Sequence, residues 1–312
     1  MASRHVDIDP DGDTLIILPT MKAEGDDKNE ASQVTFRTSM KHLTLASLRA
    51  KKVLLGNFSE AVPQGSDGLR HYKFDPMFDP DAFEIVLRII HAQAHKLPKE
   101  ISLATMTHVA IIADDLLCSS PIAPFVPQWS SDDNFWAASV QFRETLHKIF
   151  ICLVFGLKEK FSSMTHKAII NSIDQKIVCG IPLCLPILQA IKVQRTSVLK
   201  QHLKYLYMVE KELNDDELCW ECRAENIGYL KYNLHLHQLP ASESSELWAK
   251  MTCRELKDKM KKFKFRKFSG CGLSGHGHPS LKKHIAKALK IFSSPDKGLD
   301  LAPLLKAATA SE

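Results

Sequence analysis

The sequence predicts an α+β domain followed by an all-α domain. Short runs in which apolar and polar residues alternate, as in half-buried strands, occur within residues 13–75. From residue 79 onward apolar residues recur at helical spacing instead. Net charge also changes along the chain: residues 1–129 hold 13 Lys and Arg against 17 Asp and Glu (−4), and residues 130–312 hold 28 against 19 (+9). The two halves are therefore expected to belong to different folding units.

The composition is that of a globular protein. Of the 312 residues 45% are hydrophobic and 25% are charged, which excludes disorder as the main state. No run approaches the roughly 20 apolar residues of a membrane span. The first 14 residues carry Asp7, Asp9, Asp11 and Asp13 where a signal peptide needs cations and an apolar run. We expect a soluble protein of the cytoplasm or nucleus, with no membrane partner and no disulfide framework among its eight cysteines.

The first domain is predicted to span residues 13–129, after a flexible N-terminus at residues 1–12. Ser39 is a suitable N-cap for a helix that ends before Gly56, because serine accepts a backbone hydrogen bond and glycine stops helices. Apolar and β-branched residues bounded by Pro, Gly or polar loops predict strands over residues 13–19, 33–38 and 69–75.

Helices are expected for the rest of the chain. Asp79 followed by Pro80 is typical of an N-cap and the first helical residue, and Ser102 is expected to cap the next helix. A Pro-rich segment at residues 121–129 ends the first domain. The second domain is predicted to span residues 134–308, before a flexible tail at residues 309–312. Its helical patterns cover residues 135–160, 163–177, 188–213, 245–263 and 279–292.

The segment FRTSMKHLTLAS at residues 36–47 resembles the entry from strand to helix in BTB/POZ domains. The chain is most similar to BTB/POZ proteins of the filamentous-fungal type, and Trp136 with residues 149–156 resembles the helical extension that those proteins carry. The resemblance implies a short mixed sheet flanked by helices in the first domain. The later pieces that fit the family in order are residues 56–61, 69–74, 79–91, 97–98 and 102–115.

The resemblance also implies a function in protein–protein interaction. BTB domains homodimerise, heterodimerise or dock onto cullin-type ubiquitin ligase scaffolds, so a non-enzymatic adaptor or scaffold is the expected role. Dimers of the family use the first helix and the opening strand. The equivalent apolar residues here are Leu15, Ile17, Met40, Leu43, Leu45, Leu48 and Leu54.

Four residues of the C-terminal half could hold a metal ion. Cys219 and Cys222 have the CxxC spacing that places two thiolates on one zinc ion, and Cys271 and His276 follow in a glycine-rich stretch. A structural zinc site is one interpretation. Packed structural thiols are the other, and we favour them because the second pair lacks the regular spacing of zinc ligands. No other cofactor is expected.

A basic segment with interleaved aromatic residues covers residues 257–268. One interpretation is a nucleic-acid-associated regulatory protein, because cations bind phosphates and rings stack on bases. The other is an amphipathic helix end whose Met and Phe side chains enter the core, which we favour because no nucleic-acid-binding motif accompanies the segment. The cations are Lys257, Lys259, Lys261, Lys262, Lys264, Arg266 and Lys267.

Catalytic patterns are weak. The glycine-rich stretch at residues 270–277 is neither preceded by a predicted strand nor followed by the GK[ST] of a phosphate-binding loop. His42, His91 and His108 lie on separate predicted helices without an adjacent nucleophile. We therefore expect no enzymatic activity.

Overall fold

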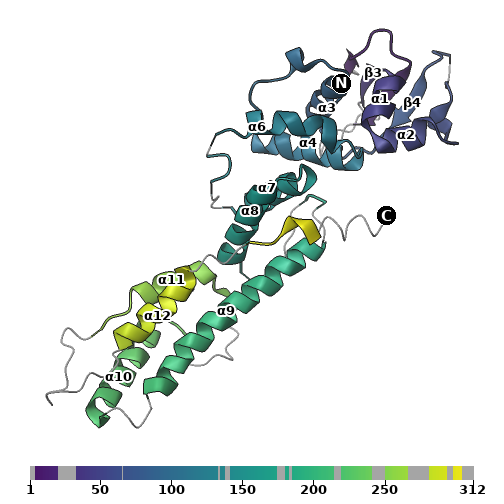
Figure 1. Ribbon diagram of the computed structural model, residues 1–312. Coiled ribbons are helices and arrows are strands. Elements are labelled where there is room, and N and C mark those ends of the chain that lie inside the picture. Colours follow the sequence, from purple (N-terminus) through teal and green to yellow (C-terminus); the bar gives the residue numbers. More distant parts are fainter. Residues whose placement is uncertain are drawn as a thin grey trace, which may run out of the picture. The chain divides into compact units, whose positions relative to one another are not determined.

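The computed structural model describes eleven segments of the chain, and it divides into two compact units (Figure 1). Unit 1 consists of residues 1–139, 146–160 and 180–182, and unit 2 of residues 140–145, 161–179 and 183–312. None of the helices within the described segments is long and apolar enough to cross a membrane. The described segments are residues 4–19, 33–64, 66–132, 134–137, 141–173, 180–182, 185–213, 219–240, 250–265, 281–293 and 298–303.

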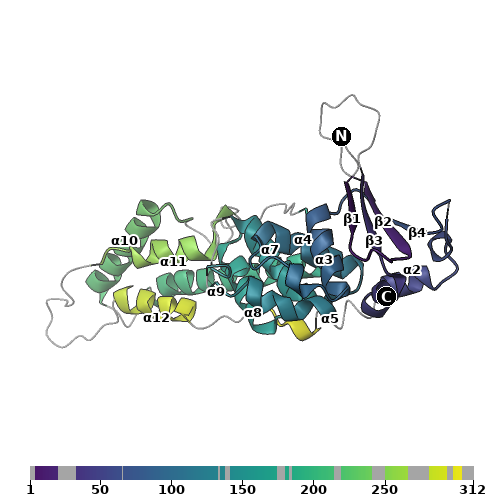
Figure 2. The same cartoon turned by 90° about the horizontal axis from the view of Figure 1, so that it is seen from above.

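A four-stranded mixed sheet forms one side of unit 1 (Figure 2). Its order is β1-β3-β2-β4, with β2 antiparallel to β3 and with β1 and β4 parallel to their neighbours. The strands are β1 (Arg4–Asp7), β2 (Thr14–Pro19), β3 (Gln33–Thr38) and β4 (Arg70–Lys73). Together with the helices they confirm the α+β class, and the three predicted strands are present.

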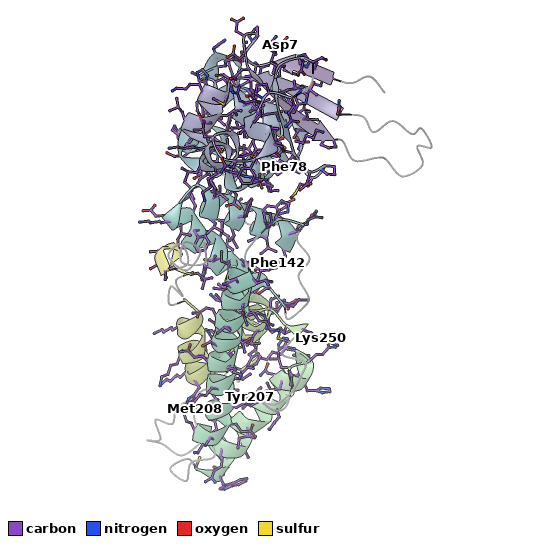
Figure 3. All side chains as sticks on the ribbon, turned by 90° about the vertical axis from the view of Figure 1, so that its right-hand side faces the viewer. Asp7, Phe78, Phe142, Tyr207, Met208 and Lys250 are labelled. Atoms are coloured by element: carbon purple, nitrogen blue, oxygen red, sulfur yellow. The ribbon has the colours of Figure 1, made fainter. Side chains whose placement is uncertain are left out.

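Alternation along the strands decides which face of the sheet is buried. Ile16, Leu18 and Phe36 are at most 1% exposed and form the inner face. Leu15 and Ile17 point to the opposite face, where they are half-buried. On the inner side Phe36 stacks on Phe83, and a cluster of rings extends from this pair: Phe74, Phe78 (labelled in Figure 3) and Phe83, with centroids 5.1–5.8 Å apart.

The first strand lies where a flexible N-terminus was predicted at residues 1–12, so that prediction is wrong for β1. Backbone pairing with β3 orders the segment, and the N–H groups of Ile8 and Asp9 continue it by donating to the Arg37 carbonyl at 3.0 and 3.1 Å. The Arg4 guanidinium binds the carboxylates of Asp81 and Glu84 at 2.6 and 2.5 Å. The sequence RHVD shows little apolar alternation, because an edge strand is held mainly by its backbone.

The helix predicted after Ser39 is two helices, α1 (Met40–Ala46) and α2 (Leu48–Leu54). Ser47 separates them with an extended backbone and is the N-cap of α2: its Oγ accepts from the Ala50 N–H at 2.9 Å. The same hydroxyl donates to the Leu116 carbonyl at 2.5 Å. A tertiary contact therefore ends the first helix, and local spacing does not reveal it. The short helix η1 (Ser59–Ala61) follows.

The next two helices begin where the sequence predicts. Asp79 caps α3 (Pro80–Ile90), accepting from the Ala82 N–H at 2.8 Å, and Ser102 caps α4 (Leu103–Asp115), accepting from the Thr105 N–H at 3.0 Å. The Pro-rich end of the predicted first domain is a chain of short helices. The remaining short elements are η2 (Ala94–Lys96), α5 (Ser119–Ile122), η3 (Ala123–Phe125) and α6 (Val126–Trp129).

Most of α7 (Phe142–Val154) belongs to unit 1, although the predicted boundary assigned it to the second domain. Leu146, Ile149 and Phe150 are at most 1% exposed. Lys148 Nζ donates to the Ala137 carbonyl at 3.0 Å, and the Trp136 indole donates to Ser130. A helical pattern shows that a helix buries one face, but it does not show which core receives that face.

Unit 2 is built from helices: α8 (Lys158–Asn171), whose first residues belong to unit 1, then α9 (Leu185–Leu213), α10 (Trp220–Leu236), α11 (Cys253–Lys261) and α12 (Leu281–Ser293). The long helix α9 packs against α10, α11 and α12. Arg195 of α9 is buried, and it donates to the carbonyls of Ser172 and Met251 at 2.8 and 2.7 Å. The helical class predicted for this half holds in its described segments.

A C-terminal segment of unit 2 lies on α8. The Leu299 N–H donates to Thr165 Oγ1 at 2.9 Å, and Leu301 is buried. Gly298 approaches the helix so closely that a Cβ atom there would lie 1.8 Å from the Ser162 carbonyl oxygen, so only glycine fits. The predicted flexible tail at residues 309–312 lies outside the described residues.

Candidate functional site

The helix α2 has one face in the core of unit 1 and one face in solvent. Ala50 and Leu54 are at most 2% exposed and point inward. Leu48 and Leu55, seven residues apart, lie on the opposite side and are 61% and 58% exposed. Apolar side chains on an outward helix face contribute nothing to the core that the inward face builds.

Other apolar side chains are exposed in the same stretch of chain. Leu45 at the end of α1 is 75% exposed, and Phe58 and Val62 on either side of η1 are 56% and 61% exposed. We call Leu45, Leu48, Leu55, Phe58 and Val62 the apolar surface of unit 1. Five large apolar side chains are thus exposed within eighteen consecutive residues, whereas exposed apolar side chains on ordinary surfaces are scattered singly.

The end of α4 anchors the start of α2, which carries Leu48 of the apolar surface. The N–H groups of Leu48 and Arg49 donate to the carbonyls of Leu117 and Leu116 at 3.5 and 3.4 Å. Arg49 also forms an ion pair with Asp115, and burial raises the pKa of Asp115 while the guanidinium opposes that rise. These contacts hold the start of α2, with Leu48, against the end of α4, which limits the entropy that a partner would have to remove from this part of the surface on binding.

The structure divides the seven residues predicted for the interaction surface. Leu43 and Leu54 are 1% and 2% exposed, so their assignment to a contact surface is wrong: they belong to the core. Leu45 and Leu48 are the most exposed of the seven. Leu15, Ile17 and Met40 are half-buried.

The sequence analysis missed Leu55, Phe58 and Val62. Leu55 could have been found, since it repeats the position of Leu48 two helical turns later. Phe58 and Val62 flank a three-residue helix, where no periodic pattern separates inward from outward positions.

A buried histidine supports the start of α1. His91 is 8% exposed: its Nδ1–H donates to the Leu87 carbonyl at 2.8 Å, and its Nε2 accepts from the Ser39 N–H at 3.0 Å. The His42 ring lies 5.0 Å away, centroid to centroid. Burial lowers the pKa of His91, and the neighbouring His42 adds to the shift. The neutral imidazole is the form that can accept the Ser39 hydrogen bond.

The zinc interpretation stays a prediction. Cys219 is the N-cap of α10 and Cys222 lies in the first turn of that helix, whereas Cys271 and His276 lie outside the described residues. Within the described segments no group of three or more His, Cys, Asp or Glu side chains is placed to hold a metal ion.

The described part of the basic segment agrees with the amphipathic interpretation. Met260 and Phe263 are at most 5% exposed, and Phe263 stacks on His237 at 5.6 Å, so its ring is not available to stack on bases. Lys257 and Lys259 are half-buried. Lys261, Lys262 and Lys264 are exposed, and Arg266 and Lys267 lie outside the described residues.

The buried thiols of unit 1 are packing residues. Cys118 and Cys152 are at most 1% exposed. Burial raises the pKa of Cys118 to about 12 and raises that of Cys152 as well. Thiols in this state do not supply a thiolate nucleophile near neutral pH.

The chain matches no family model, no curated protein and no solved structure.

Proposed function

We propose that this protein is a non-enzymatic adaptor of the BTB/POZ type whose N-terminal unit binds a second copy of the chain through the apolar surface. The observation that carries the proposal is the exposure of Leu45, Leu48, Leu55, Phe58 and Val62 on one short, well-anchored stretch. Burying an exposed leucine contributes about 1.5–3 kcal/mol, so a few such residues suffice for association.

The order of elements in unit 1 supports the family assignment. Strands β2 and β3, helices α1 and α2, strand β4 and helices α3 and α4 follow one another as the resemblance implies. In that family the first helix takes part in dimer contacts, and here the same region carries the apolar surface. The family assignment and the exposed side chains thus lead independently to one region.

The test is the oligomeric state of the full chain, measured by native mass spectrometry. We expect a dimer for the wild type and a monomer for the double variant Leu45→Asp, Leu48→Asp, because a carboxylate cannot be buried unpaired at an apolar contact. Val193→Asp is the matched control, since Val193 of α9 is 65% exposed in unit 2. A folded double variant that stays dimeric would contradict the proposal, and so would a monomeric wild type.

A heterologous partner is the second form of the proposal. The family resemblance implies that a cullin-type ubiquitin ligase scaffold is a candidate. A purified scaffold protein should then co-elute with the wild-type chain in size-exclusion chromatography. It should elute separately from the double variant. Separate elution of wild type and scaffold would remove this partner class.

A further inference from the structure

Exposed lysines form one row on α9 and one row on α12 of unit 2. Within each row they are three, four or seven residues apart, a spacing that places them along one side of a helix. The function proposed above uses unit 1 and assigns no role to them. The lysines are Lys200, Lys204 and Lys211 of α9 and Lys283, Lys287 and Lys290 of α12, and all six are exposed. We call them the basic surface of unit 2.

Both helices bury the side that lies opposite to their lysines. On α9 Val198, Leu206 and Val209 are at most 6% exposed, and on α12 Leu281 and Ile285 are at most 2% exposed. The helix α12 packs against α9 and lies beside it in Figures 1 and 3. Packing of the apolar sides therefore holds the lysines on the outside of the unit.

An ion pair shows that the two rows lie on the same side of the helix pair. His284 of α12 binds the Glu212 carboxylate of α9 at 2.7 Å, so these two residues mark where the helices face each other. One turn away on each helix, a buried residue lies on one side of the ion pair and an exposed residue on the other. The buried and exposed residues are Ala288 and Lys287 on α12, and Val209 and Met208 on α9. Both lysine rows thus border the contact between the helices on its solvent side.

The carboxylates nearby do not neutralise the lysines. The sequence of α12 contains no Asp or Glu. On α9 Glu210 binds Lys231 at 2.6 Å, and Glu212 binds His284. Within the described segments none of the six lysines forms an ion pair. The acidic residues 215–217 follow α9 outside the described residues, and they are half as many as the lysines.

We propose that the basic surface of unit 2 binds the phosphate backbone of a double-stranded nucleic acid. A duplex carries one negative charge per about 1.7 Å of its axis, so a row of cations meets several phosphates at once. The lysine rows of α9 and α12 are about 16 and 10 Å long, at a rise of about 1.5 Å per residue. A small anion would contact only a part of such a surface.

The apolar side chains of this surface favour a duplex over a single strand or a membrane. Single-strand sites stack bases on exposed aromatic rings, and membrane-bound helices insert an exposed apolar face. Here the apolar sides of α9 and α12 are buried. In the described part of α9, the large apolar side chains exposed on the side of the lysines are Val193 and Met208, and neither is aromatic. Because phosphate contacts carry no sequence information, we expect binding to be independent of base sequence.

The test is fluorescence anisotropy of a labelled DNA duplex of about 20 base pairs, titrated with the full chain between about 50 and 200 mM NaCl. Four phosphate contacts predict a slope of about −3.6 for log K against log[salt], a loss of affinity of about a hundredfold over this range. An RNA duplex of the same sequence distinguishes the two sources of a duplex backbone. No binding of either duplex at the lowest salt concentration would overturn the proposal.

A single strand of the same length and vesicles of phosphatidylserine and phosphatidylcholine are the competing ligands. We expect both to bind more weakly than the duplex at the same salt concentration, because the surface lacks exposed rings and an exposed apolar face. Tighter binding of the single strand or of the vesicles would contradict a duplex as the partner.

A triple variant localises the contact to the two helices. Lys204→Gln, Lys287→Gln, Lys290→Gln removes lysines from both rows. It should reduce the magnitude of the salt slope by about 2.7, since each lost phosphate contact removes about 0.9. The side chains are exposed, so the variant is expected to fold. An unchanged slope would overturn the assigned surface.

The matched control removes the same charge from unit 1. Lys51→Gln, Lys52→Gln, Lys73→Gln replaces three exposed lysines there and should leave the salt slope unchanged. Equal effects of the two triple variants would show attraction to the net charge of the whole chain and would contradict a defined surface.

A gain of affinity protects the test from misfolded variants. Met208 lies one turn from Lys204 and is 40% exposed, so Met208→Lys adds a cation to the basic surface. It should tighten duplex binding at low salt and increase the magnitude of the slope by about 0.9. Unchanged or weaker binding by folded Met208→Lys would overturn the placement of the duplex along α9.

Discussion

The two units are held together by different kinds of buried contact. In unit 1 the strands pair through their backbones, and rings from β3, α3 and the segment after β4 fill the space under the sheet. In the described part of unit 2 helices satisfy their own backbones, so side chains must join them. Those side chains are mostly apolar, as the buried Ile191, Leu203 and Leu256 show, and Arg195 and Asn233 add hydrogen bonds to carbonyls of other segments.

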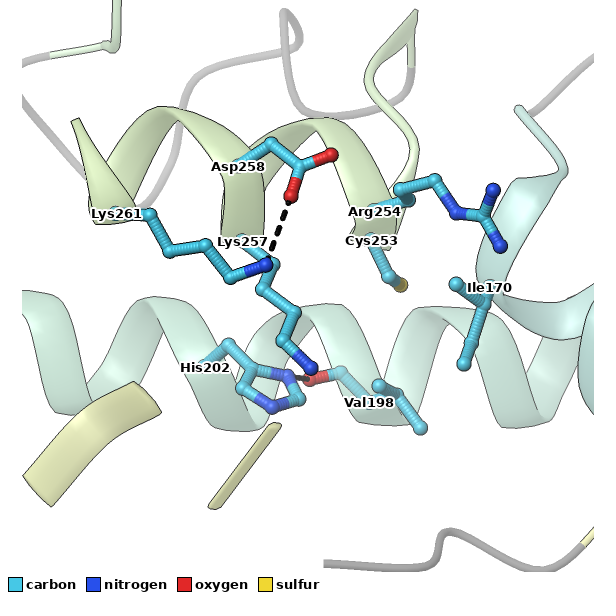
Figure 4. Close-up of a pocket in the computed structure, with 8 residues that line it drawn as sticks. All are labelled: Ile170, Val198, His202, Cys253, Arg254, Lys257, Asp258 and Lys261. Atoms are coloured by element: carbon cyan, nitrogen blue, oxygen red, sulfur yellow. Dashed lines mark hydrogen bonds and ion pairs between the residues drawn. The ribbon is translucent and has the colours of Figure 1, made fainter. Parts of the chain in front are cut away.

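This difference bears on what each unit offers to a partner. A core of packed rings leaves α2 free to present apolar side chains outward without losing stability. In unit 2 a pocket remains between α8, α9 and α11 (Figure 4), and its lining includes Arg254, Lys257 and Lys261 of α11. We expect the stability of unit 1 to depend most on the packing of its aromatic rings, and the stability of unit 2 to depend also on the hydrogen bonds of Arg195 and Asn233.

The largest effect is expected at the centre of the ring cluster. Phe83 is 0% exposed, so Phe83→Ala should lower the free energy of unfolding of unit 1 by about 3–5 kcal/mol, through lost burial and the cavity left behind. Urea unfolding followed by circular dichroism measures the change. Phe58→Ala is the matched control on the apolar surface, and it should cost less than about 1 kcal/mol. Similar losses in the two variants would refute a ring-packed core.

Unit 2 should respond to the loss of one buried guanidinium. Arg195→Met removes the donors to the Ser172 and Met251 carbonyls and should lower the stability of unit 2 by about 2–3 kcal/mol, because buried acceptors lose charged partners. Lys200→Met, at an exposed position of the same helix, is the control and should change stability little. Equal free energies of unfolding for Arg195→Met and Lys200→Met, measured in urea, would contradict the importance of the Arg195 hydrogen bonds for unit 2.

A single hydroxyl tests how firmly the apolar surface is placed. Ser47→Ala should cost about 1–2 kcal/mol, because it removes the cap of α2 and the bond to the Leu116 carbonyl. Ser39→Ala is a close control, since Ser39 is the N-cap of α1 but makes no side-chain capping bond. Thermal unfolding should therefore show a lower stability for Ser47→Ala and an almost unchanged stability for Ser39→Ala. A reversed order would contradict the capping geometry.

The smallest effect is expected from pH. Burial lowers the pKa of His91 in the folded state, so the unfolded chain binds its proton more readily. The stabilisation is therefore fully present above the ordinary histidine pKa of about 6.5 and is lost as the pH falls below it. Asp9, which favours the charged form, and His42, which opposes it, are the charged neighbours of this ring.

Unfolding of the wild type and of His91→Asn at pH 7.5 and 5.5 checks this expectation. The loss of stability between the two values should be smaller in the variant. His95→Asn, at an exposed position, should keep the wild-type loss. An unchanged loss in His91→Asn would assign the pH dependence to other groups.

Much of the fold follows from local physical chemistry. Asp79 and Ser102 cap α3 and α4 because their side chains accept hydrogen bonds from backbone N–H groups three residues later in the chain. Such a cap depends only on the local sequence. The strands β2 and β3 and the helical class of the C-terminal half follow from the periodicity of apolar residues. That periodicity differs between strands and helices because it is set by which residues face the core.

What the sequence alone determined is thus the class of each segment: strands early, helices later and a basic amphipathic α11. Only the tertiary structure decided the rest, because those features depend on partners distant in the chain. Pairing with β3 gives β1 its strand conformation, and the hydrogen bond from Ser47 to the Leu116 carbonyl ends the first helix there. The core against which α7 packs decides that most of this helix belongs to unit 1. Contacts with distant parts of the chain also decide that Leu43 lies in the core and Leu45 in solvent, although the sequence analysis assigned both leucines to one contact surface.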